Sequence, residues 1–180
     1  MKTFPTLILG IALLVVQSCK EKEEPLVQQS SEITTFYLIR HAEKDRSDPQ
    51  NLDPELNQDG LGRAMHWAEI LDEVALDAIY TTDYERTSMT AAPAAVKQNI
   101  TVQYYDPGTL DVEQFKQENL GKNVLVVGHS NSTPALANDL LGDYRYSDMD
   151  DSDNGSLFIV QVIGDQTWSS RLHFNCNCPD

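Results

Sequence analysis

The stretch Phe36-Tyr37-Leu38-Ile39-Arg40-His41 joins a short apolar run to an arginine and a histidine. Later in the chain a second apolar run, Val124-Leu125-Val126-Val127-Gly128, is followed directly by His129. Short β-branched and aromatic runs of this kind predict buried strands of a parallel sheet, and ligands bind where such strands end at their carboxyl edge. We therefore expect His41 and His129 to face the same crevice.

A third strand is predicted over Ala78-Ile79-Tyr80-Thr81-Thr82, and the residues after it, Asp83-Tyr84-Glu85-Arg86, lead into a helix. Arg86 then lies in the first helical turn beyond the strand and joins Arg40 at the crevice. Guanidinium groups are planar and permanently charged, which suits phosphate oxygens, and an imidazole can act as a nucleophile or as a hydrogen-bond donor. Two arginines beside two histidines therefore favour phosphoryl transfer through histidine.

Four stretches now carry a resemblance to a known family: Leu38-Ile39-Arg40-His41-Ala42-Glu43-Lys44, residues 82–86, Thr90-Ala91-Ala92-Pro93, and Val127-Gly128-His129-Ser130. In this order, with the three main motifs each at a strand end, they resemble the histidine phosphatase superfamily, the phosphoglycerate-mutase-like proteins of branch 1. The likeness extends from about residue 34 to residue 174.

The resemblance implies a mechanism. Neutral His41 attacks phosphorus to give a phosphohistidine, and water then releases phosphate. Arg40, Arg86 and a protonated His129 bind the substrate and stabilise the equatorial oxygens, so no metal ion and no cofactor are expected. The implied activity is that of a metal-independent phosphoric monoester hydrolase acting on a small phosphorylated substrate.

Two positions depart from the family pattern. Ala42 stands where the family usually has a glycine, and it cannot adopt a positive φ as freely. Many members also carry a glutamate that protonates the leaving group, and this chain has no clear match. Asp106, directly after the strand predicted over residues 100–105, is the first candidate for that catalytic role, and Glu113 is the second.

Two other functions remain open on the sequence alone. One is a phosphoglycerate-mutase-type phosphotransferase, although no insertion for recognising a sugar acid is visible. The other is a membrane-anchored protein that binds a phosphorylated ligand without turnover, which the missing glutamate would permit.

Helices are predicted between the strands. Asn57 is a suitable N-cap for an apolar stripe from Leu61 to Leu71. Pro93 is expected to end the Arg86 helix near Ala92 and to begin a second one. After His129, Thr133 is the expected cap of a helix that ends at Gly142.

The C-terminal part reads as a β-hairpin, with strands over residues 156–163 and 168–174 joined at Gly164-Asp165. The order of elements predicts a three-layer α/β/α sandwich with a mostly parallel sheet and a C-terminal hairpin. Two loops, over residues 43–55 and 144–154, are expected at the mouth of the crevice. His66 is expected to face solvent, and His173 to be structural.

Composition excludes one class of partner. The 180 residues carry a net charge of −15 with a pI near 4.4. Because no cluster of lysine and arginine is present to neutralise a phosphate backbone, nucleic acid is not an expected partner. A small phosphorylated substrate remains compatible, since remote surface charges are screened beyond a Debye length of about 8 Å.

The first residues read as an export signal. Lys2 precedes an apolar run over residues 7–16, and Ser18-Cys19 resembles a bacterial lipoprotein box. We therefore expect a signal peptide over 1–18, a lipidated tether over 19–33, the phosphatase domain over 34–175 and a tail over 176–180. Cys19 would anchor the protein to the bacterial cell envelope, in the outer membrane on its periplasmic or surface face; an ordinary signal peptide is the alternative.

Overall fold

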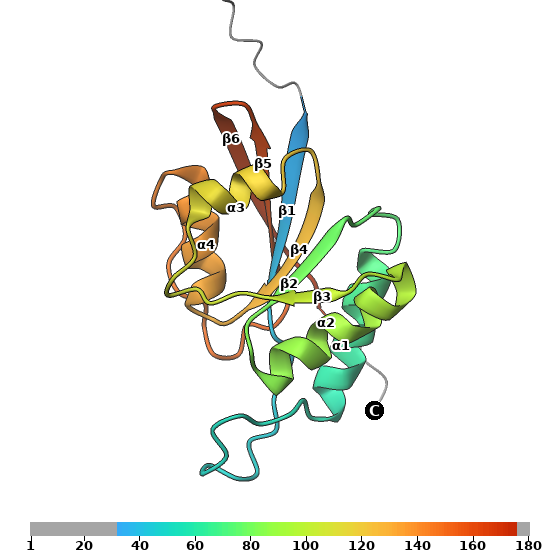
Figure 1. Cartoon of the computed structure of the whole chain (residues 1–180). Helices are drawn as coiled ribbons and strands as arrows, with labels where there is room; N and C mark the ends of the chain where they lie inside the picture. The colour runs from blue at the N-terminus through green and yellow to red at the C-terminus, as the bar shows by residue number, and fades with distance from the viewer. Residues whose placement is uncertain (1–31, 176–180) are drawn as a thin grey trace, which may run out of the picture.

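The computed structural model describes residues 32–175, which form one mixed sheet covered by helices (Figure 1). The elements in chain order are β1 (Ile33–Arg40), α1 (Gln58–Ile70), β2 (Ala78–Thr81), α2 (Glu85–Gln98), β3 (Val102–Tyr104), α3 (Val112–Glu118), β4 (Asn123–Gly128), α4 (Ser132–Leu141), β5 (Ser156–Ile163) and β6 (Gln166–His173). The predicted signal peptide, Cys19 with the tether as far as residue 31, and the predicted tail over 176–180 lie outside the described residues. Among residues 32–175, no helix has both the length and the apolar character needed to cross a membrane.

The strand order is β3-β2-β4-β1-β5-β6, and the first four strands of this order run parallel. Arg40 pairs with Gly128, so the residues that follow them, His41 and His129, leave neighbouring strands at the same edge. The amide of His41 donates to the carbonyl of Gly128 at 2.9 Å. Strand pairing therefore brings two histidines together that are far apart in the sequence.

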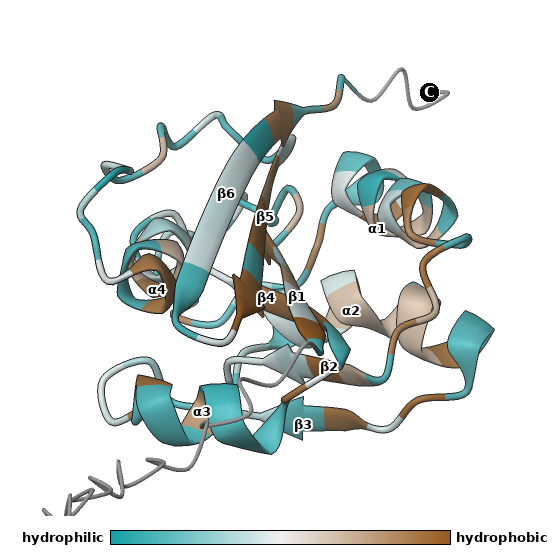
Figure 2. Cartoon of the chain, turned by 90° about the horizontal axis from the view of Figure 1, so that it is seen from above, coloured by the Kyte–Doolittle hydropathy of each residue, from teal (hydrophilic) through white to brown (hydrophobic). Residues whose placement is uncertain are grey.

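The sheet has a helical layer on each face, as Figure 2 shows: α1 and α2 on one side, α3 and α4 on the other. Successive strand residues point to opposite faces. Leu38 accordingly packs in the cluster that includes α3 and α4, whereas Ile39 packs in the cluster with Trp67 of α1. The three-layer α/β/α prediction is confirmed, and so is the C-terminal hairpin, which forms the antiparallel edge of the sheet.

Helix α1 begins as predicted. The side chain of Asn57 accepts a hydrogen bond from the amide of Gly60 at 2.8 Å, which satisfies one of the free donors at the helix start.

The predicted break at Pro93 is wrong, because α2 runs without interruption from Glu85 to Gln98. An internal proline removes the N–H that would bond to the carbonyl of Met89, and its ring crowds that carbonyl. The buried side chains of Ala91, Ala94 and Ala95 hold the same helix against the sheet. Burial of this face therefore outweighs the intrinsic cost of one internal proline.

The predicted cap at Thr133 is also wrong, because α4 begins at Ser132 with Asn131 as its N-cap. The hydroxyl of Thr133 instead donates to the carbonyl of Ile39 in β1, at 3.2 Å. The helix ends at Gly142, as predicted, with a φ of 68°. The hydroxyl that was expected to cap the helix thus ties its first turn to the strand carrying Arg40.

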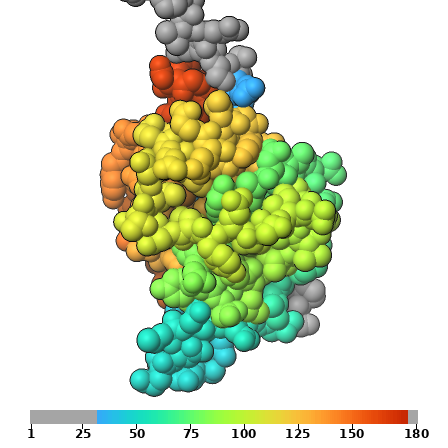
Figure 3. Space-filling model, in the orientation of Figure 1, coloured from blue at the N-terminus to red at the C-terminus, as the bar shows by residue number. Residues whose placement is uncertain are grey.

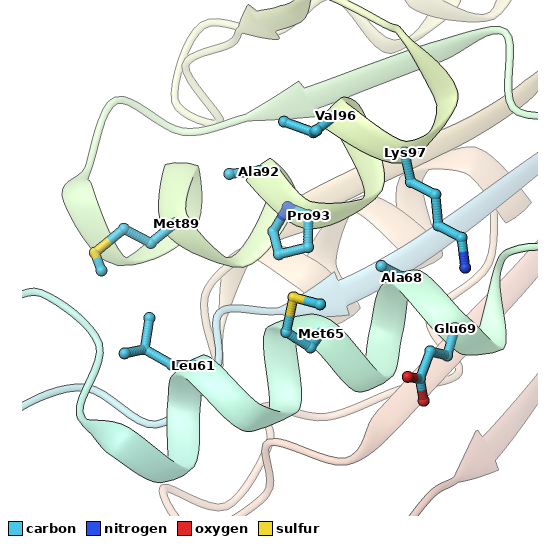
Figure 4. Close-up of a pocket in the computed structure, with 9 residues that line it drawn as sticks. All are labelled: Leu61, Met65, Ala68, Glu69, Met89, Ala92, Pro93, Val96 and Lys97. Carbon is cyan, nitrogen blue, oxygen red and sulfur yellow. The ribbon is translucent and has the colours of Figure 1, made fainter.

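A shallow apolar groove separates α1 from α2 on the outer face of that layer (Figure 4). Leu61 and Met65 of α1 face Met89, Pro93 and Val96 of α2 across it. The groove contains neither histidine nor arginine, so it is distinct from the crevice where β1 and β4 end.

Candidate active site

His41 is a buried side chain, 4 % exposed, at the end of β1. Its Nδ1 lies 2.7 Å from the carbonyl oxygen of Ala42. Because a carbonyl can only accept, Nδ1 carries the proton and the lone pair of a neutral ring is on Nε2. Asn154 further fixes this residue, since its amide nitrogen donates to the carbonyl of His41 at 2.8 Å. These contacts leave Nε2 as the nucleophilic atom of the ring.

His129 faces His41, with ring centroids 5.5 Å apart at an interplanar angle of 66°. Its Nε2 lies 2.9 Å from the hydroxyl of Thr82, at the end of β2. Its backbone amide donates to Ser132 Oγ at 2.9 Å, which ties the residue to the start of α4. The ring is thus oriented by a hydroxyl at one nitrogen, and Nδ1 is left for a ligand.

Arg40 is 3 % exposed and is held by the segment before β5. Its Nη1 donates to the backbone carbonyls of Asp150 and Asp151, both at 3.0 Å, and of Asp153 at 3.3 Å; Nη2 pairs with the carboxylate of Asp151 at 2.8 Å. The Nε–H is buried without a protein partner among the described residues. A buried donor left without an acceptor is costly, so this atom indicates where an anion would bind.

Arg86 repeats this arrangement from the first turn of α2. Its Nη1 donates to Asp53 Oδ1 at 3.1 Å, and its guanidinium carbon lies 4.2 Å from the centre of the Tyr84 ring. Its Nε is also buried with no protein partner in the part of the chain that the structure describes. Both arginines are therefore fixed through one side of the guanidinium and keep one buried donor unpaired.

The environment keeps both histidines neutral at pH 7. Burial, with a further contribution from Arg40, Arg86 and His129, lowers the pKa of His41 to about 3, against the raising effect of its bond to Ala42. Burial and the two arginines lower the pKa of His129 to about 4. The neutral His41 agrees with its expected role as nucleophile. A neutral His129 differs from the protonated His129 that we expected from the sequence.

The structure also places the two candidate proton donors. Asp106 lies two residues after the end of β3 and lines a hollow together with His129, but its oxygens accept hydrogen bonds from the amide of Gly108 and the hydroxyl of Thr109 in its own turn. Glu113 lies on α3, paired with Lys116, in a depression that also includes the β5–β6 turn. The structure therefore places Asp106 in the same hollow as His129, whereas Glu113 lies in a different depression.

Two hollows adjoin the histidines. The first, the His41 hollow, is lined by His41, Lys44, Arg46 and the segment 150–154, and measures about 540 Å³. The second, the His129 hollow, is lined by residues 82–84 and 105–108 with His129, Asn131 and Ser132, and measures about 530 Å³. Among residues 32–175, no three histidine, cysteine, aspartate or glutamate side chains come together as metal ligands.

The comparisons with known proteins agree with this geometry. Residues 36–107, which contain Arg40, His41 and Arg86, match the family model of the histidine phosphatase superfamily, branch 1. This match covers 72 of the 180 residues and lies in the N-terminal part of the described fold, so this part of the chain is similar to that superfamily. No curated protein matches the sequence.

Solved structures share the fold of this domain at low identity. A protein assigned as the phosphohistidine phosphatase SixA of Agrobacterium tumefaciens is 22 % identical, with a TM-score of 0.57 over 77 % of this chain and 97 % of its own. The protein histidine phosphatase SixA in complex with tungstate is 13 % identical, with a TM-score of 0.62 over 77 % and 96 %. A mycobacterial glucosyl-3-phosphoglycerate phosphatase is 15 % identical, with a TM-score of 0.55 over 72 % and 90 %.

Ala42 fits the domain in place of the usual glycine. It is fully buried, and its amide donates to Thr90 Oγ1 at 2.9 Å. Among the described non-glycine residues, only Asn99 has a positive φ. The backbone at Ala42 therefore does not need a glycine, and the departure from the family pattern introduces no strain.

Several residues of the site were missed by the sequence analysis. Asp53 and Asp151 hold the arginines, Thr82 orients His129, and Asn154 fixes His41. The loops that contain Asp53 and Asp151 were expected at the crevice mouth, and the segment after β1 does project from this end of the molecule (Figure 3, cyan). Which acidic side chain meets which arginine depends on loop packing, for which the sequence has no local signal.

Proposed function

We propose that this protein is a phosphomonoester phosphatase that acts through a phosphohistidine on His41. The observation that supports this most strongly is the pair of buried, unpartnered Nε–H donors of Arg40 and Arg86 beside a neutral His41. Tetrahedral oxyanions satisfy such donors, and guanidinium groups are the side chains best suited to them. The superfamily match supports the phosphatase activity.

The first step is an in-line displacement. The lone pair on His41 Nε2 forms a bond to phosphorus while the bond from phosphorus to the leaving oxygen breaks. The bond from Nδ1 to the Ala42 carbonyl disperses the positive charge that develops on the ring. Arg40 and Arg86 stabilise the charge on the equatorial oxygens, so we propose that no metal ion is needed.

In the second step a water oxygen attacks phosphorus, the nitrogen–phosphorus bond breaks and its electron pair returns to Nε2, releasing inorganic phosphate. His129 would donate a hydrogen bond to a phosphoryl oxygen, and it would take up a proton when the dianion binds because a negative charge raises the pKa of a neighbouring imidazole. Asp106, as the candidate carboxylate beside His129, is the proposed donor to the leaving oxygen.

Labelling tests this proposal. Incubation with a ³²P-labelled phosphomonoester and rapid quenching should give an acid-labile label on the wild-type protein and none on His41→Ala. Turnover should persist in EDTA. Absence of both label and turnover between about pH 5 and 8, the range in which histidine normally titrates, would contradict the enzyme assignment.

A non-catalytic phosphate-binding protein is the second candidate, because the carboxylate oxygens of Asp106 are engaged in their own turn. Binding of inorganic phosphate without any covalent label would favour it. A mutase would instead isomerise 3-phosphoglycerate with little release of free phosphate.

We also propose that Cys19 carries a lipid anchor in the bacterial cell envelope. The support is the lipoprotein-like sequence Ser18-Cys19 after an apolar run. Metabolic labelling with a radioactive fatty acid should mark the wild-type protein and not Cys19→Ser. Cell fractionation of the same strains would show whether the wild-type protein is membrane-bound.

A further inference from the structure

We propose that the His129 hollow binds the leaving group of the substrate and selects a positively charged one over a negatively charged one. This inference rests on the proposed phosphatase function, and it names the class of substrate: phosphate esters whose alcohol or phenol carries an ammonium or similar cation.

The position of the phosphoryl group follows from the unpartnered donors. Arg40 is 3 % exposed, and its buried Nε–H, together with that of Arg86, fixes the anion between the two arginines and His41. In an in-line displacement the leaving oxygen lies on the side of phosphorus opposite His41 Nε2. His41 lines the first hollow but not the second, so the leaving group extends into the His129 hollow.

The charge of that hollow is one-sided. Asp83 and Asp106 line it, both exposed, and no lysine or arginine does. Asp83 has no ion pair with any residue of the described range 32–175. The His41 hollow differs in that its charge is mixed: Lys44 and Arg46 line it together with Glu43, Asp150 and Asp151. A carboxylate on the leaving group would therefore meet negative charge in the His129 hollow, whereas an ammonium group would be attracted there.

Aromatic rings add to this preference. Tyr84 is 42 % exposed and stands edge-on to His129, with centroids 5.0 Å apart, and Tyr105 forms part of the same wall. Tyrosine faces attract cations and also pack against planar groups. Arg86 already lies over one face of the Tyr84 ring, and Asp106 is the proposed proton donor. The hollow thus offers the carboxylate of Asp83 and the ring of Tyr105 to a group attached to the phosphate.

The test uses three aryl phosphates whose para substituent is positive, neutral or negative: 4-(aminomethyl)phenyl, 4-(hydroxymethyl)phenyl and 4-(carboxymethyl)phenyl phosphate. A methylene spacer keeps the three phenols similar as leaving groups. We expect kcat/KM to be about tenfold higher for the ammonium than for the carboxylate compound, with the neutral compound between them, and the ratio to shrink at high salt.

Substitutions test whether the His129 hollow causes this preference, which is expressed as the ratio of kcat/KM for the ammonium compound to kcat/KM for the carboxylate compound. Asp83→Asn should lower it about threefold and Asp83→Lys should bring it to one or below, as expected for one partly screened charge. Glu73→Lys makes the same change of charge in the exposed turn after α1, near the start of β2 at the opposite edge of the sheet, and should keep the wild-type ratio. Each ratio is taken within one variant, so any general loss of activity cancels.

The outcomes separate this inference from the proposed function. If the wild type hydrolyses p-nitrophenyl phosphate but shows a ratio of one or below, the charge preference is overturned and the proposed phosphatase function stands. A clear preference for the carboxylate compound would place the leaving group beside Lys44 and Arg46. A ratio that Asp83→Asn and Asp83→Lys leave unchanged also overturns the inference. If no ester is hydrolysed, the proposed function fails, and dissociation constants measured by calorimetry with His41→Ala still decide the charge preference.

Discussion

Lowering the pH from 7 to 5 should destabilise this protein through His41. The pKa of this side chain is about 3 in the folded protein, mainly because of burial, against an ordinary value of 6.5 in the unfolded chain. Between these two values the unfolded chain binds more protons than the folded one, so the free energy of unfolding falls as the pH falls. The contribution of neutral His41 to the free energy of unfolding is fully present above pH 6.5 and is lost progressively as the pH falls below that value.

The size of the effect follows from the two pKa values. Between pH 7 and 5, the loss from His41 alone is about 2 kcal/mol. For a domain of this size that corresponds to a melting temperature lower by about 4–8 °C. His129, whose pKa is lowered to about 4, acts in the same direction, but it is less buried than His41 and its contribution is smaller.

Urea unfolding at pH 7 and pH 5, in phosphate-free buffers of equal ionic strength, measures this loss. His41→Gln has no titrating ring and can still donate to the carbonyl of Ala42, so its stability should fall by about 2 kcal/mol less than that of the wild type. Ser130→Ala, a change of a non-titrating residue next to His129, should keep the wild-type pH dependence. If His41→Gln and the wild type lose the same stability, the buried neutral histidine does not produce the effect.

Three further predictions concern packing and chemistry. Gly128→Ala would place a Cβ 2.9 Å from Ser132 Oγ, the atom that accepts a hydrogen bond from the amide of His129. We expect the free energy of unfolding in urea to fall by about 1–3 kcal/mol and turnover to be lower. Unchanged values of both quantities would refute this prediction. Pro93→Ala restores a helical N–H and should raise stability by about 1–2 kcal/mol, where a decrease would show that proline fits α2 better than alanine. Asp106→Ala should slow hydrolysis of alkyl phosphates more than that of p-nitrophenyl phosphate, whereas Glu113→Ala should change neither; the opposite pattern in steady-state assays would reassign the donor.

The sequence was sufficient to predict the parts of the fold that depend on local pattern. The apolar runs before His41 and His129 predict their strands, and the spacing after Asn57 predicts α1, because side-chain periodicity and capping are properties of neighbouring residues. These patterns also predict that both histidines and Arg40 lie at one edge of the sheet, because the carboxyl ends of parallel strands meet at the same edge.

The remaining features depend on tertiary contacts. At Pro93 a local rule predicted a break, and burial of the opposite face of α2 overrode it. At Thr133 the hydroxyl satisfies a strand carbonyl in place of the helix end. The pairing of Asp53 with Arg86 is equally non-local, because the two residues come from different elements and meet only in the folded chain.

The hydrogen bonds that hold the Arg40 guanidinium have a consequence for the synthesis of the protein. This guanidinium belongs to the first strand, yet the carbonyls that fix it come from residues 150–153, near the end of the domain. During synthesis Arg40 and His41 leave the ribosome early, and more than a hundred further residues are added before residues 150–154, which hold them in place, have been made. An incomplete chain therefore lacks the contacts that fix Arg40, and the proposed phosphate site can become organised only after residues 150–153 have been made.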